Sequence, residues 1–98
     1  MAISPTALDR LVKRLASRPR VQRIWLFGSR ARGDARERSD IDIAIEAPDA
    51  DRREWLEVCR LVEEEADTLL PIDVIRVEEA PDRLRKQVRA EGRVLFER

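Results

Sequence analysis

The sequence predicts a small α+β protein, in which a mixed β-sheet has helices packed on one face, in the order α-β-β-α-β-α. Apolar and polar residues alternate from 40 to 46, which is the period of a strand with one buried face. Two other segments repeat apolar residues at helical spacing. No linker is long enough to divide the 98 residues, so we expect one domain spanning residues 1–98.

The first helix is predicted to begin at Ser4-Pro5, with serine as the N-cap and proline in the first turn. Pro19 follows its end. The side chains expected to face the core recur every three or four residues: Leu8, Leu11, Val12 and Leu15.

Residues 21–27 are β-branched or aromatic and predict a largely buried strand that runs into Gly28. Residues 29–38 predict a polar loop with one helical turn, in which Gly33 allows a tight turn. In the next strand, apolar residues occupy one face and mainly acidic residues occupy the other. Ile41, Ile43 and Ile45 face the core, while Asp40, Asp42, Ala44 and Glu46 face the other way.

Asp51 is placed to cap a second long helix, which Pro71 stops. Residues 72–77 predict a third strand, and Pro81-Asp82 opens a short last helix that Gly92 ends. Residues 94–96 are expected to pack back as an apolar tail. The second helix is expected to bury Trp55, Leu56, Cys59, Val62, Ala66 and Leu69. With the helices on one face, the other face of the sheet would be open and carry the aspartates.

The composition excludes several kinds of function. Lys+Arg and Asp+Glu number 20 each, so net charge gives no argument for a nucleic-acid binder. The chain has no histidine, which excludes Ser-His-Asp and Cys-His catalysis and histidine metal ligation. Its single cysteine, Cys59, fits a buried structural thiol. No signal peptide or membrane span is predicted, so we expect a cytoplasmic protein.

Three aspartates are the candidates for binding a metal. Asp40 and Asp42 lie on one face of one strand, a pattern that a solvated surface also produces. Asp73 lies between apolar residues of the third strand, where a carboxylate is costly unless it is paired or binds a metal. If the second and third strands are neighbours, the three carboxylates converge and favour Mg²⁺ or Mn²⁺. The alternative is that Asp73 pairs with an arginine such as Arg76.

Gly28 and Ser29 supply the second half of the candidate site. Glycine at a strand end lets a phosphate approach the backbone, and successive N–H groups can hold it. Arg30 and Arg32 are candidates for phosphate contact, although solvated loop arginines are commoner, and Ser39 precedes the acidic strand. Together the two halves predict metal-assisted phosphoryl or nucleotidyl transfer.

These residues resemble the signature of the polymerase-β-like nucleotidyltransferase superfamily. Gly28-Ser29, ten further residues and then Asp40-Ile41-Asp42 match its pattern. The strings GSRARG and SDIDIAI, an isolated later aspartate and the tail AEGRVLFER resemble its minimal nucleotidyltransferase (MNT) branch. The resemblance covers nearly the whole chain.

The resemblance implies a role for each matching residue. Asp40, Asp42 and Asp73 would bind magnesium, Asp73 would also serve as base, and Gly28 and Ser29 would contact the β- and γ-phosphates of ATP. It further implies a HEPN-type toxin as partner and AMP transfer from ATP to a tyrosine of that toxin. An antitoxin that acts by contact alone, and transfer to a small molecule or an RNA end, remain alternatives. The short chain would need a partner or an oligomer interface to bring the acceptor.

Overall fold

A computed structural model describes residues 5–33, 41–65 and 72–98. The elements follow the order α1 (Pro5–Ala16), β1 (Arg23–Phe27), α2 (Ser29–Arg32), β2 (Ile41–Glu46), α3 (Arg52–Glu65), β3 (Ile72–Arg76), a 3-10 turn η1 (Val77–Glu79), α4 (Asp82–Glu91) and β4 (Arg93–Glu97). The α+β class is as predicted. The segment expected to be an apolar tail is a fourth strand.

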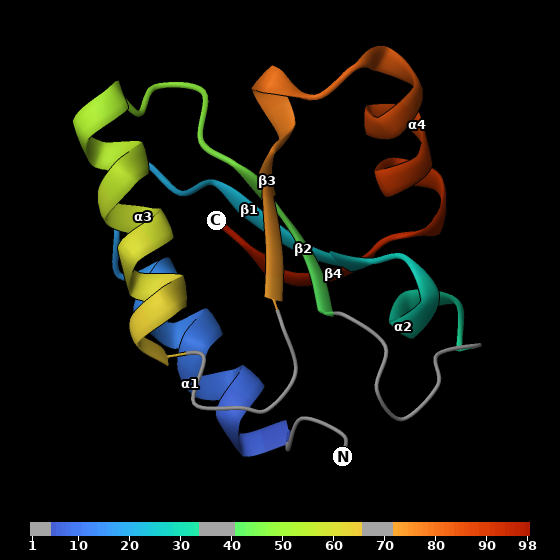
Figure 1. Cartoon of the computed structure of the whole chain (residues 1–98), viewed down its shortest axis with the longest axis horizontal. Coiled ribbons are helices and arrows are strands. Elements are labelled where there is room, and N and C mark those ends of the chain that lie inside the picture. The colour runs from blue at the N-terminus through green and yellow to red at the C-terminus, as the bar shows by residue number, and fades with distance from the viewer. Residues whose placement is uncertain (1–4, 34–40, 66–71) are drawn as a thin grey trace.

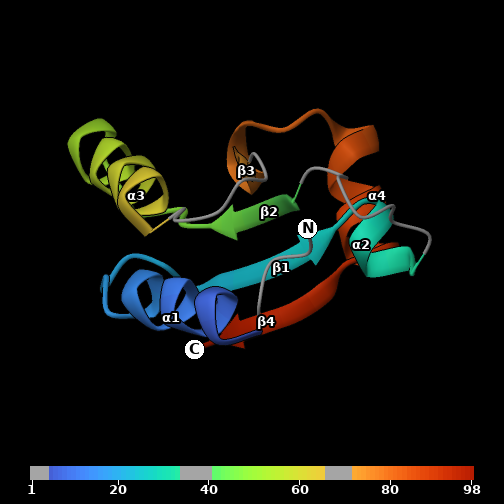
Figure 2. The ribbon, with the colours of Figure 1, turned by 60° about the horizontal axis from the view of Figure 1, so that its bottom comes forward.

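The four strands form one mixed sheet in the order β3-β2-β1-β4, which Figure 2 shows from top to bottom. β1 pairs antiparallel with β2 and with β4, and β2 pairs parallel with β3. The last strand therefore lies beside the first, and β3 forms one edge of the sheet. A bulge between Ile24 and Trp25 shifts the register of β4 along β1.

Helices α1 and α3 cover one face of the sheet, on the left in Figure 1. The predicted stripes form this core: Leu11, Leu15, Ile41, Ile43 and Ile45 are each at most 1% exposed. Alternation in β2 therefore buries its isoleucines as expected.

The sequence predicted that the opposite face of the sheet is open. This is wrong, because α4 packs on that face (Figure 1). Val88 of α4 is 1% exposed and packs with Trp25, Phe27 and Ala44. The middle of the sheet is thus covered on both sides, and at its end Asp73 is exposed and Asp42 half-buried. Gly92 ends α4 as predicted, but with extended backbone (φ −70°). A glycine is needed there for close approach, since a Cβ would meet the Val88 carbonyl and Trp25.

Helix α3 begins with a reciprocal cap. The Glu54 N–H donates to Asp51 Oδ1 at 2.8 Å, and the Asp51 N–H donates to Glu54 Oε1 at 3.2 Å. This confirms Asp51 as the predicted cap. The fully buried side chains of α3 are Val58, Leu61 and Val62. Trp55 and Cys59 are half-buried, and Leu56 is 55% exposed, contrary to prediction. The predicted Ala66 and Leu69 lie outside the described residues.

Candidate active site

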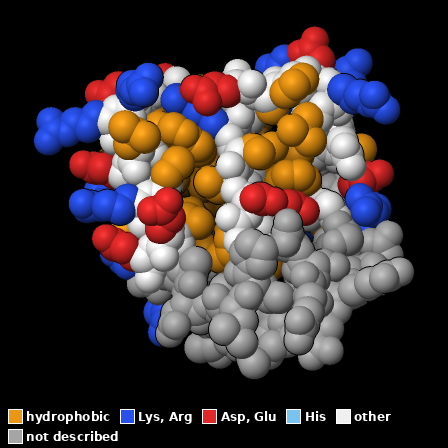
Figure 3. All heavy atoms as spheres, viewed as in Figure 1, with side chains coloured by type: hydrophobic (Ala, Val, Ile, Leu, Met, Phe, Trp, Pro, Cys, Tyr) orange, Lys and Arg blue, Asp and Glu red, His pale blue; other side chains and the backbone are white. Residues whose placement is uncertain are grey.

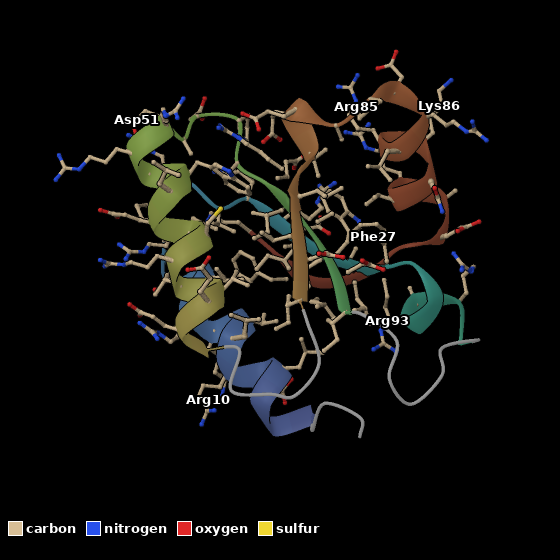
Figure 4. The ribbon with its side chains drawn as sticks, in the orientation of Figure 1. Arg10, Phe27, Asp51, Arg85, Lys86 and Arg93 are labelled. Atoms are coloured by element: carbon tan, nitrogen blue, oxygen red, sulfur yellow. The ribbon has the colours of Figure 1, made fainter. Side chains whose placement is uncertain are left out.

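The site forms where β1 ends, beside the first residues of β2 and β3. Asp42 and Asp73 are register partners on parallel neighbouring strands, so their side chains leave the same face of the sheet side by side. Phe27, the last residue of β1, is the register partner of Asp42 on the other side (Figure 4). The predicted approach of Asp73 to Asp42 is therefore confirmed.

Gly28 turns the chain immediately after β1. Its φ of +74° lies in the left-handed region, where residues with a Cβ are strained. A Cβ at this position would overlap the carboxylate of Asp42. Any other residue would therefore strain the turn and displace the Asp42 carboxylate. The sequence predicted that Gly28 and Asp42 belong to one site, but not that they touch, because their contact follows from the pairing of β1 with β2.

One helical turn, α2, follows Gly28 as expected. The Gly28 carbonyl accepts from the N–H groups of Ala31 and Arg32, both at 3.1 Å. Arg32, a predicted phosphate contact, forms an ion pair with Glu91 of α4 at 3.5 Å. Its guanidinium therefore also links α2 to α4. Gly33 adopts a φ of +83°, which confirms the predicted tight turn.

Arg76 does not neutralise Asp73. Side chains along β3 point alternately to the two faces of the sheet. Arg76 therefore lies on the face covered by α3, and Asp73 lies on the opposite face. On the α3 side, the Arg76 guanidinium donates to the carbonyls of Ala47 at 2.7 Å and Ala50 at 2.6 Å, and lies 5.4 Å from the centre of the Trp55 ring. The alternative that Asp73 pairs with Arg76 is excluded.

Asp73 is exposed at the edge strand. The premise that it is buried among apolar residues was wrong, because both neighbours in sequence point to the other face. Its significance comes from its position beside Asp42.

Asp40 and Ser39 lie outside the described residues, as do the side chains of Ser29 and Arg30. Within residues 5–33, 41–65 and 72–98, no three carboxylate or thiol side chains gather as a metal-binding group. Asp42, half-buried on β2, and Asp73, exposed on β3, nevertheless offer hard oxygen atoms side by side, which suits a divalent cation. In the same ranges no helix is long and apolar enough to cross a membrane.

A left-handed glycine turn beside two carboxylates offers backbone N–H groups suited to a phosphate and oxygen atoms suited to a divalent cation. The sequence model described as "Polymerase beta, Nucleotidyltransferase" matches residues 9–98. The chain therefore belongs to this nucleotidyltransferase family. A search of curated protein sequences gave no match.

Solved structures similar to the chain include several toxin–antitoxin complexes. One, with AMP-PNP, is 29% identical with a TM-score of 0.71, over 92% of this chain and 73% of that chain. The MntA-HepT complex is 28% identical with a TM-score of 0.69, over 97% and 74%. A tri-AMPylated Shewanella oneidensis HEPN toxin in complex with MNT antitoxin is 27% identical, with a TM-score of 0.66, over 95% and 71%. The resemblance to the MNT branch is thereby confirmed.

Proposed function

We propose that this chain transfers AMP from ATP to a tyrosine hydroxyl of a HEPN-type toxin and so acts as its antitoxin. The observation that carries the proposal is the register pair Asp42–Asp73 beside the left-handed turn at Gly28. The family supports nucleotidyl transfer, and similar structures include an AMP-PNP complex and an AMPylated HEPN toxin.

The proposed roles follow the positions of the residues. The turn at Gly28, with Ser29, would hold the β- and γ-phosphates of ATP, with Arg30, Arg32 and Ser39 as further candidate contacts. Asp40, Asp42 and Asp73 would hold Mg²⁺ or Mn²⁺. When bound, such an ion neutralises phosphate charge and favours attack at the α-phosphorus. Asp73 lies on the edge strand, where an acceptor can approach it from solvent.

The acceptor oxygen forms a bond to the α-phosphorus, and the bond from that phosphorus to the oxygen bridging to the β-phosphate breaks. Pyrophosphate leaves with the electron pair of that bond. Asp73 accepts the proton of the acceptor hydroxyl and passes it to solvent.

The test uses ATP labelled at the α-phosphate, Mg²⁺ and the HEPN-type protein encoded beside this chain. We expect label on that protein, and a loss of at least about 100-fold in rate for Asp42→Asn and for Asp73→Asn, the scale of removing an electrostatic stabiliser. Asp49→Asn, at an exposed aspartate after β2, is the matched control and should retain the rate. Thermal unfolding verifies that each variant is folded.

Two results would contradict the proposal. Label from γ-labelled ATP on the partner would indicate phosphoryl transfer, and full α-label transfer by both aspartate variants would exclude this site. Neutralisation of the toxin by variants that no longer transfer label would favour inhibition by contact alone.

A further inference from the structure

The edge of the sheet at β3 exposes its backbone. In the order β3-β2-β1-β4, β3 pairs with β2 on one side, and no strand of the described part of the chain lies on its other side. Such an edge presents N–H and C=O groups that can pair with an added strand. Figure 3 shows this backbone in white, running between two groups of hydrophobic side chains.

A groove of about 330 Å³ follows this edge. Trp55 and Cys59 of α3 line it on one side of β3, and Leu84 of α4 lines it on the other. Val74 and Ile75 of β3 project to these two sides in turn and are half-buried. An extended segment laid along β3 would therefore find an apolar surface for side chains on both of its faces.

The net charge beside the groove is negative, because Arg76 faces two carboxylates, Glu78 at 3.3 Å and Glu79 at 3.8 Å. Of these, Glu79 is 68% exposed just beyond the end of β3. Arg76 itself is 11% exposed and bound to the carbonyls of Ala47 and Ala50. Lys86 points away from the sheet on the outer side of α4 (Figure 4). The groove is thus complementary to a segment with apolar residues between basic ones.

We infer that this groove binds an extended segment of the protein that receives the nucleotide, which pairs with β3 as a fifth strand. This inference rests on the proposed function. In an added strand, the residue opposite Asp73 shares its face of the sheet, as Asp42 does on the other side. Docking along β3 therefore places one residue of the partner beside Asp73, and that residue is the acceptor.

The first experiment is amide hydrogen exchange on this chain with and without the HEPN-type protein encoded beside it, in the presence of AMP-PNP and Mg²⁺. We expect the amides of residues 72–76 to exchange at least about tenfold more slowly in the complex, because strand pairing protects them. Amides of β4, at the other edge, serve as the internal reference. Unchanged exchange in β3 while the complex forms would overturn the inference.

The second experiment compares an apolar residue of the groove with one outside it. Leu84→Arg places a like charge against the basic segment and removes apolar contact, so KM for the partner should rise at least about tenfold. Leu56→Arg makes the same change at the exposed surface of α3 and should leave KM unchanged. Since Leu84 also packs on the second core, Glu79→Lys provides a variant at an exposed side chain and should raise KM as well.

Nucleotide affinity separates this inference from the proposed function. All three variants should bind AMP-PNP with Mg²⁺ as the wild type does, by calorimetry, because none lies at the turn or the aspartates. If the wild type transfers label and all three variants have its KM for the partner, the docking site is overturned and the proposed function stands. Protection of β3 without any transfer would support the docking site and refute the proposed function.

Discussion

At the scale of single residues, Gly28 and Gly33 form a natural comparison. Both have positive φ, +74° and +83°, but only at Gly28 would a Cβ meet another group, the Asp42 carboxylate. Gly33→Ala should therefore lose about 1 kcal/mol of unfolding free energy from backbone strain alone. Gly28→Ala should lose about 2–3 kcal/mol, because Asp42 must also move.

Urea denaturation measures both values, and calorimetry with AMP-PNP and Mg²⁺ should show weaker nucleotide binding for Gly28→Ala only. If both variants lose the same unfolding free energy, the close contact between residue 28 and Asp42 does not affect stability.

Cys59 provides a prediction with a defined pH dependence. Burial raises the pKa of its thiol, and the negative charges of Glu63 and Glu79 raise it further. Because the thiolate is the reactive form, modification by a disulfide reagent at pH 8 should be slower than that of glutathione, and its rate should reach its plateau at a higher pH. Glu79→Gln should lower the pKa and speed the reaction, whereas Glu57→Gln should not.

The same shift affects stability. The unfolded thiol ionises at a lower pH than the folded one, so the contribution of Cys59 is present below the ordinary thiol pKa and is lost as the pH rises through the folded value. Stability of the wild type relative to Cys59→Ala should accordingly fall in alkaline solution. A difference that does not change with pH would contradict the shift.

At the scale of elements, Arg76 joins the end of β3 to the segment between β2 and α3. Its guanidinium binds the carbonyls of Ala47 and Ala50, and Glu78 accepts from both Arg76 and the Ala47 N–H. Arg76→Ala removes the hydrogen bonds to these carbonyls and the positive charge beside half-buried Glu78, and should cost about 2–4 kcal/mol. Arg76→Lys should recover only part, because an ammonium lacks the planar fork.

Arg60→Ala is the matched control. Arg60 is 67% exposed and pairs with Glu64 one helical turn away, so its loss should change stability by less than about 0.5 kcal/mol. Comparable costs for Arg60→Ala and Arg76→Ala in urea titrations would show that the Arg76 contacts do not stabilise the fold.

Elements with a strong local pattern were predictable, and those that depend on their surroundings were not. The isoleucine alternation identifies β2, and Asp51 identifies the start of α3, because each pattern lies within a few neighbouring residues. The short segment of β4 carries charged residues at both ends, so only its pairing with β1 defines it as a strand. The stripe of Leu84 and Val88 identifies α4 as amphipathic but does not reveal which face of the sheet it covers.

The candidate site follows the same division. Gly28, Asp42 and Asp73 were identifiable as residue types at suggestive positions. Their assembly depends on parallel pairing of β2 with β3, which is a tertiary feature. Two further features also depend on the sheet. Asp73 is exposed because β3 is an edge strand, and Arg76 binds its partners on the opposite face because side chains alternate along a strand.

At the scale of the whole molecule, β1 belongs to both hydrophobic cores: Ile24 and Leu26 face α1 and α3, while Trp25 and Phe27 face α4. β4 covers the edge of this shared strand. Deletion of residues 93–98 would expose that edge and remove Leu95 and Phe96 from the core under α1 and α3. We therefore expect the truncated chain to lose its cooperative thermal transition, measured by circular dichroism.

Two point variants at the end of β4 distinguish specific anchoring from a general effect of shortening the strand. Arg98 donates to the carbonyls of Val21 at 3.0 Å and Ala16 at 2.9 Å, and lies 5.3 Å from the centre of the Phe96 ring. Arg98→Ala should cost about 1–3 kcal/mol, because these bonds tie the last strand to the connection between α1 and β1. Glu97→Ala removes only an exposed cross-strand pair with Arg23 and should cost less than about 1 kcal/mol. If the two variants unfold at the same urea concentration, closure of the sheet does not depend on the Arg98 contacts, and pairing of the β4 backbone with β1 is the stabilising element.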